Sequence, residues 1–366
     1  MSTLIKAIVV ALSVGAIVNL SSCGSHEDDK ALGEVVVDVD QAVEVEIDTT
    51  RLIPLEANSR SLLYNVRGLN IVDGNFYVAS VDMIKAFDRN GKFISEISGK
   101  GQGPEEYLGL KQVAASGDTI LIFDNMTPKI MSFGTDGTFL SSLSIPKGEI
   151  EHGRKPNFIA FGDYGDYRIT RNGWTDNTSE SNPMFSVYSS DWDYVGDLPG
   201  REMRNGEYFP DMFAVDPDRQ IVYYWEMFND TVFVLNSEGV YPKFYLNYGS
   251  RRVPSDIMEL NSSYDRINAI VKGGKTECVT NARSFQVYGK YLFFTISSFA
   301  NKVYLCVLDT KSLSAKVIGL SSVNERYSLN PIIALDNDML YVNMTDNADV
   351  EANPLLYPLS VQSLTE

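Results

Sequence analysis

Short apolar runs alternate with polar turns along the chain, and one arrangement of them recurs. In its clearest form Phe87 ends one apolar run, Asp88-Arg89-Asn90-Gly91-Lys92 is the turn, and Phe93 opens the next run. Asp, Asn and Gly together favour a tight turn between two strands. Weaker copies of this hairpin follow at residues 133–139, 188–192, 235–239, 308–311 and 356–357.

A second tight turn precedes an apolar run in the upstream half of each copy. Asp73-Gly74-Asn75 is the first of these turns, and the others lie near residues 116–118, 165–166, 218–219, 289–290 and 337–338. Where no insertion intervenes, the copies are 46 to 48 residues apart (133 − 87, 235 − 188, 356 − 308). Four short strands repeated every ~40–50 residues are typical of propeller blades. Six copies predict an all-β, six-bladed β-propeller with four-stranded antiparallel blades over residues 44–366.

The last copy leaves too little chain for its fourth strand, while an apolar segment precedes the first complete copy. We therefore expect residues 51–56 to pair with the last blade, which would close the ring and leave no free sheet edge there.

One helical insertion is predicted within residues 255–272. Ile257, Leu260, Tyr264, Ile267 and Val271 recur at helical spacing and would form one apolar face. Ser255 or Asp256 would cap its start, and Gly273-Gly274 would end it. Two interpretations are open: the helix packs on the rim of its own propeller, or it serves as a lid or partner contact.

The N-terminus has the pattern of an export signal. Lys6 precedes a short apolar run, residues 7–18, which ends at Leu20-Ser21-Ser22-Cys23. This tripeptide and Cys resemble the lipobox of bacterial lipoproteins, which implies a signal peptide over residues 1–22 and a lipidated Cys23. The alternative is a plain secretory signal followed by a chance cysteine.

Residues 23–43 are expected to form an acidic tether. Its first part, Glu27-Asp28-Asp29, resembles the surface-export signal of Bacteroidota lipoproteins; the alternative is a merely solvated linker. We expect an outer-membrane protein held by its lipid and exposed at the cell surface, or alternatively facing the periplasm. The formal net charge is −17, which argues against nucleic acid or an anionic membrane surface as the partner.

Residues 99–107 carry the most specific motif, Gly101-Gln102-Gly103-Pro104-Glu105-Glu106-Tyr107. It resembles a motif of the six-bladed β-propeller lipoproteins of Bacteroidota, which are distant relatives of NHL and TolB-type propellers. The resemblance covers residue 52 to the end. The family motif has glycine where this chain has Glu105, so a turn that needs a positive φ is expected to change there. We expect Tyr107 to pack between blades, and residues 205–208 to be a decayed second copy.

All long connections of the predicted propeller fall on one face, so a ligand site is expected there, over the channel. Near the starts of the innermost strands lie Arg67, Lys111, Asn157, Asp211, Arg283 and Asn330. With three cations, this ring would suit an anionic group; the alternative is a structural role in hydrogen bonds or ion pairs. Trp174, in a long loop, would stack on a sugar or an apolar side chain, or else pack between blades.

Groups that carry catalysis are scarce. The two histidines are His26, in the tether, and His152, and the chain has no G-x-S-x-G or H-E-x-x-H motif. No catalytic residue, metal or cofactor is expected. Cys278 and Cys306 would be either a disulfide or two thiols, and Cys306 lies in a run typical of a buried strand.

The sequence therefore favours a non-enzymatic envelope lipoprotein that binds a glycan, a peptide or a protein partner, for example a transport protein of the outer membrane. One alternative is an enzyme acting on polysaccharide or peptide through carboxylates such as Glu202 and Glu207. Another is a scaffold in an outer-membrane complex.

Overall fold

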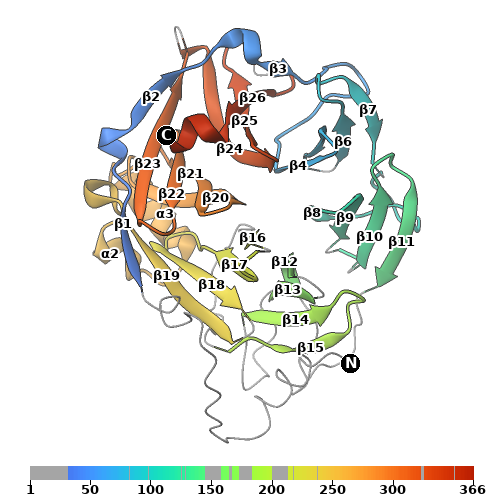
Figure 1. The fold of residues 1–366 in the computed structure, drawn as a ribbon, viewed down its shortest axis with the longest axis horizontal. Coiled ribbons are helices and arrows are strands. Elements are labelled where there is room, and N and C mark those ends of the chain that lie inside the picture. The colour runs from blue at the N-terminus through green and yellow to red at the C-terminus, as the bar shows by residue number, and fades with distance from the viewer. Residues whose placement is uncertain are drawn as a thin grey trace, which may run out of the picture.

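Six antiparallel sheets stand around a central axis in the computed structural model (Figure 1). The structure describes residues 32–81, 83–97, 99–124, 126–127, 129–144, 158–164, 167–172, 184–199, 213–216, 218–236, 238–322, 325–349 and 351–366. The innermost strands β4, β8, β12, β16, β20 and β24 each contact the next, and β24 contacts β4. The predicted six-bladed propeller is confirmed.

The blades follow the chain in order, from the innermost strand outward. Blades 1 to 3 comprise β4 (Gly68–Val72), β5 (Asn75–Ala79), β6 (Ile84–Phe87), β7 (Phe93–Glu96); β8 (Leu110–Ser116), β9 (Thr119–Asp124), β10 (Lys129–Gly134), β11 (Phe139–Ser144); and β12 (Phe158–Tyr164), β13 (Tyr167–Asn172), β14 (Phe185–Ser189), β15 (Tyr194–Asp197). Blades 4 to 6 comprise β16 (Phe213–Asp216), β17 (Ile221–Tyr224), β18 (Thr231–Asn236), β19 (Gly239–Asn247); β20 (Val279–Tyr288), β21 (Tyr291–Ser298), β22 (Val303–Asp309), β23 (Ser314–Ser321); and β24 (Tyr327–Asp336), β25 (Met339–Asp346), β26 (Leu355–Ser360), β3 (Ile53–Pro54).

The N-terminal part of the chain closes the ring as predicted. β3 pairs antiparallel with β26, with Ile53 opposite Leu356 and Pro54 opposite Leu355. The sixth hairpin, predicted at residues 356–357, does not form, because these residues lie inside β26 and the chain continues into α4 (Val361–Thr365). The fourth strand of blade 6 is supplied by β3 instead.

Two further strands extend the outer edges of blades 4 and 5. β1 (Gly33–Val36) runs parallel to β19, and β2 (Val43–Glu46) runs parallel to β23. We call residues 33–46, including the 3₁₀ turn η2 (Val39–Gln41), the strap; it lies along the outside of the ring in Figure 1. The prediction of a tether over residues 23–43 was wrong from Gly33 onward, because these residues belong to the strap. Acidic residues and valines alternate in the strap, and Val35 and Val37 are fully buried. Burial of every second residue is the pattern of a strand.

The third turn of a blade, which is the repeated hairpin, seats against the preceding blade. A Cβ on Gly91 would lie 2.2 Å from the carbonyl oxygen of Pro54 in β3, and the N–H of Glu56 donates to the Gly91 carbonyl oxygen at 2.8 Å. The backbone φ is positive in five of these turns, at Gly91, Gly137, Trp192, Gly239 and Leu313. Gly137 and Gly239 approach the end of β7 and Pro199 in the same way. The hairpin recurs because it joins neighbouring blades.

The residue that opens this turn holds the backbone around it. The Asp88 Oδ1 accepts the N–H groups of Asn90 and Lys92 at 2.8 and 2.9 Å. In blade 5, Asp309 Oδ1 accepts those of Lys311 and Ser312 at 2.9 and 3.1 Å. This local capping explains why a short acidic or amide side chain recurs there.

The motif at residues 99–107 joins blades 1 and 2. Tyr107 is fully buried in the cluster between these blades, as expected. A Cβ on Gly101 would lie 2.0 Å from Glu106 Oε2, whereas neither Glu105 nor the glycines of the motif have a positive φ. Glu105, which stands where the family motif has glycine, thus adopts no positive φ, in agreement with the expected change of this turn. The motif needs glycine because the Glu106 carboxylate folds back over the backbone, where it accepts the Gly103 N–H at 2.8 Å.

The helical insertion consists of two helices, α2 (Ser255–Met258) and α3 (Ser263–Lys272). Ser262 caps α3 by accepting the Asp265 N–H at 3.1 Å, which restarts the helical phase. Ile257 and Ile270 are therefore buried, against Phe228 and Val253 among others, while Tyr264 and Val271 are 73% and 51% exposed. The single apolar face predicted for residues 255–272 was wrong, but packing on the propeller's own rim is confirmed.

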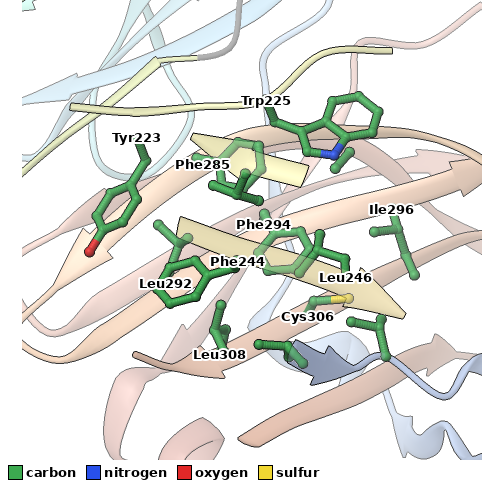
Figure 2. Close-up of a cluster of buried hydrophobic side chains, with 14 of the residues drawn as sticks. Tyr223, Trp225, Phe244, Leu246, Phe285, Leu292, Phe294, Ile296, Cys306 and Leu308 are labelled. Carbon is green, nitrogen blue, oxygen red and sulfur yellow. The ribbon is translucent and has the colours of Figure 1, made fainter. Parts of the chain in front are cut away.

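The largest core cluster fills the space between blades 4 and 5 (Figure 2). Phe285 and Phe294 stack with ring centroids 5.0 Å apart.

The two cysteines of the described propeller are not paired. Cys306 lies in this cluster and Cys278 lies under the helical insertion, and both are free thiols. Burial raises the pKa of each thiol. No helix in the described part of the chain is long and apolar enough to cross a membrane.

Replacing Gly91 with Ala should destabilise the protein by about 3 kcal/mol or more, because the new methyl group meets Pro54 and the backbone φ is +81°. Urea denaturation measures the loss. Gly117 also has a positive φ, of +60°, but nothing lies within 4 Å of its Cβ position. Gly117→Ala should therefore cost only about 1 kcal/mol, and equal losses for both variants would contradict the seating of the turn.

Asp309→Asn should destabilise the protein at pH 7 by about 1–2 kcal/mol. Burial opposes ionisation of Asp309, but the Lys290 ammonium at 2.5 Å and two N–H groups outweigh it and lower its pKa to about 2. Because this pKa lies below that of an unfolded Asp, the stabilisation is complete above about pH 4 and disappears as the pH falls to about 2. The difference in unfolding free energy between wild type and variant should shrink over that range. Glu351→Gln, at an exposed site, is the control.

Candidate functional site: the two faces of the propeller

The connections of the propeller fall into two groups that lie on opposite faces. The first and third turns of each blade are short and define what we call the short-turn face. The second turns and the connections between blades, including the helical insertion, define the long-loop face. Because strands alternate in direction, each residue's place in its blade decides the face on which it lies.

Three of the predicted ligand-site residues have described side chains. Arg67 is exposed directly before β4, and its N–H donates to the Ala79 carbonyl oxygen at 2.8 Å. Arg283 and Asn330 are half-buried in β20 and β24, which are neighbouring inner strands. Lys111 is the second residue of β8, and its side chain is outside the described set. Asn157, Trp174 and Asp211 lie outside the described residues, as do Cys23, His26, His152, Glu202 and Glu207.

Two polar side chains of blade 5 bond to the inner strand of blade 6. Each of β20 and β24 has a bulge, between Arg283 and Gln286 and between Leu329 and Ile333. Close to these bulges, Gln286 Nε2 of β20 donates to the Ile333 carbonyl oxygen at 3.4 Å, and Thr295 Oγ1 of β21 donates to that of Pro331 at 2.7 Å. These bonds join the two blades, and the role of the predicted ligand-site residues stays a prediction.

Large apolar side chains stand out from the long-loop face. Tyr264, Met126 and Tyr64 are 73%, 68% and 60% exposed. They come from three connections: α3 between blades 4 and 5, the second turn of blade 2, and the segment that leads into β4. Sequence reasoning missed Tyr64 and Met126, because single apolar residues within polar segments give no periodic signal.

A buried carboxylate fixes the turn that exposes Met126. Asp124 is fully buried and accepts the N–H groups of Leu108, Gly109, Met126 and Thr127 at 2.9 to 3.2 Å. Burial opposes its ionisation, but the hydrogen bonds from Thr127 and these backbone groups dominate and lower the Asp124 pKa. The turn is therefore held rigidly enough to present an apolar side chain to solvent.

The short-turn face has a pocket of about 630 Å³ between blades 6 and 1. Its lining consists of Asp73, Gly74, Arg89, Asp336, Asn337 and Tyr341. Sequence reasoning favoured tight turns at residues 73–75 and 336–338, and it expected the ligand site on the opposite face. Among the described residues no group of His, Cys, Asp and Glu is arranged to hold a metal ion.

A second pocket, of about 320 Å³, lies where the strap meets the helical insertion. Arg251 joins the two by ion pairs to Asp40 at 2.6 Å and to Glu277 at 3.0 Å. The hydrogen bond from Arg251 lowers the pKa of Asp40. This charged cluster fastens the strap, and we assign it a structural role.

Together the fold and its faces define a six-bladed β-propeller whose long-loop face exposes apolar side chains. The chain belongs to the family described as domain of unknown function DUF4934, whose match spans residues 35–355. No curated protein matches the sequence.

Solved structures from Bacteroides share the fold. A proposed exported protein of Bacteroides fragilis superimposes with a TM-score of 0.65 and 14% identity, over 90% of this chain and 99% of that one. A member of the DUF4221 family from Bacteroides vulgatus superimposes with a TM-score of 0.53 and 14% identity, over 84% and 94% of the two chains.

Proposed function

We propose that this protein is a lipid-anchored, non-catalytic component of the cell envelope that binds a protein partner through its long-loop face. The outward placement of Tyr64, Met126 and Tyr264 on that face carries the proposal. Tyr provides a large apolar area with a polar end, and Met adapts to irregular surfaces, so both are suited to protein contacts. An outer-membrane transport protein, or a glycan- or peptide-binding lipoprotein, is the class of partner we expect.

The path of the N-terminal chain supports this orientation. Gly33 opens the strap at the rim, where a Cβ would lie 2.8 Å from the Leu313 side chain in the third turn of blade 5. Nine residues separate Cys23 from Gly33, so the stretch from one to the other reaches about 35 Å at most. An anchor at Cys23 would thus hold the propeller by its rim near a short turn and leave the long-loop face free.

The likeness to a proposed exported protein of Bacteroides agrees with an envelope location. The resemblance of residues 20–23 to a lipobox supports a lipid anchor. The motif at residues 99–107 resembles that of propeller lipoproteins related to NHL and TolB-type propellers, which supports the class of protein. These three observations are independent of the exposed side chains.

Glu substitutions at Tyr64, Met126 and Tyr264 should abolish partner binding by placing charges in an apolar contact. Crosslinking of the lipidated protein in native membranes, followed by co-purification and mass spectrometry, measures it. Tyr288→Glu is the matched control, because Tyr288 is 40% exposed at the short-turn end of β20. Recovery of the same partners with the triple variant, or their loss with the control, would contradict the proposal.

Cys23→Ala should abolish incorporation of a fatty acid into the protein, because the acylated residue is gone. Metabolic labelling with a radioactive fatty acid measures this directly. Label that persists in the Cys23→Ala variant, or wild-type protein that takes up no label, would show that the lipid is not at Cys23.

A further inference from the structure

The pocket between blades 6 and 1 lies where the chain closes its ring, and a comparison with the next seam explains why it is open. At the seam between blades 1 and 2, the Tyr77 hydroxyl donates to the Thr135 carbonyl oxygen at 2.7 Å, and Tyr77 is fully buried. This bond ties the second strand of one blade to the third turn of the next.

Tyr341 and Arg89 occupy the corresponding positions at the closing seam. Tyr341 is the third residue of β25, just as Tyr77 is the third residue of β5. Arg89 is the second residue after Phe87, and Thr135 is the second residue after Phe133, the equivalent position of the repeated hairpin. No hydrogen bond joins Tyr341 to the third turn of blade 1, although both are in the described part of the chain. Instead, the Tyr341 ring is held by an edge contact with Phe76, with centroids 5.2 Å apart, and lines the pocket.

The third turn of blade 1 contributes a guanidinium group to this pocket. Gly74 leaves room for it, since a Cβ there would lie 3.1 Å from Arg89 Nη2. Asp73 and Asp336 also line the pocket, yet neither forms an ion pair with Arg89 among the described residues. Asp336 Oδ1 accepts a hydrogen bond from Asn337 Nδ2 at 2.9 Å.

The Tyr341 hydroxyl is protonated at neutral pH and can donate. Burial is the main reason that its pKa is raised, and the charges of Asp336 and Asp338 add to the effect, while Arg89 opposes it. The pocket thus presents two acceptor-only carboxylates, one donor-only guanidinium, an amide and a phenol, all facing a space of about 630 Å³.

This combination selects the chemistry of a ligand. An anion would meet two carboxylates, and a cation would meet the guanidinium. A hydroxyl group both donates and accepts, so neighbouring hydroxyls can satisfy a carboxylate and the guanidinium at once. We propose that the closing seam binds a neutral polyhydroxylated ligand, of the size of a mono- or disaccharide, between Arg89, Tyr341, Asp73 and Asp336. This site lies on the face opposite to the partner surface and does not depend on the proposal for that surface.

Saturation-transfer NMR on the purified full-length mature protein, with neutral mono- and disaccharides as the probes, tests the proposal, and titration gives Kd. Arg89→Ala and Tyr341→Phe should each weaken binding about fivefold or more, as expected for the loss of a hydrogen bond. Tyr77→Phe is the matched control, because it removes the equivalent hydroxyl at the sealed seam. It should leave Kd within about twofold while lowering the melting temperature.

Parallel titrations with a zwitterionic amino acid and with an acidic sugar test the selection by charge. Saturation transfer to neutral sugars that the two pocket variants weaken supports the proposal. Binding of the amino acid or the acidic sugar in preference to neutral sugars overturns the ligand class. No transfer to any neutral sugar, or sugar binding that the pocket variants leave unchanged, overturns the site itself.

Discussion

The contact on which the rest of this propeller depends is the packing of a blade's third turn against the outer edge of the preceding blade. At Gly91 that contact leaves no room for a Cβ beside the Pro54 carbonyl oxygen. The turn also needs a positive φ, and an Asp side chain at its start to hold its N–H groups. One short sequence pattern thus serves both the hairpin inside a blade and the joint between blades, and for that reason it is the strongest repeated signal in the chain.

The N-terminal chain depends on this joint and extends it. β3 supplies the outer strand against which Gly91 seats, so closure of the ring and the first joint form together. The strap continues the same principle, because β1 and β2 add strands to blades 4 and 5, and Gly33 meets the third turn of blade 5. In that joint the roles are exchanged, because the turn contributes a side chain, Leu313, and the strap contributes the glycine. Three consecutive blades are therefore tied together from outside by one segment.

The same joints separate two kinds of surface. Short turns make contacts between blades, and at the closing seam, where no bond among the described residues joins Tyr341 to the third turn of blade 1, a pocket opens on their face. The long-loop face also takes part in such joints, through the motif at residues 99–107, but its connections expose Tyr64, Met126 and Tyr264. Buried groups such as Asp124 keep these connections ordered. The closing seam thus offers a polar pocket, while Tyr64, Met126 and Tyr264 add apolar area to the long-loop face.

Local patterns in the sequence determined the blades, their number and the strand that closes them, because alternation, turn residues and spacing act over a few residues. They also indicated that Tyr107 packs between blades. Tertiary structure decided the rest. The acidic run before residue 44 became a strap because Val35 and Val37 found buried positions beside β19. Ser262 restarted the helix, so Tyr264 turned outward. The pocket depends on the contact that Tyr341 does not make with a turn about 250 residues earlier in the chain. No local pattern encodes such a contact, because it exists only once the first and last blades meet.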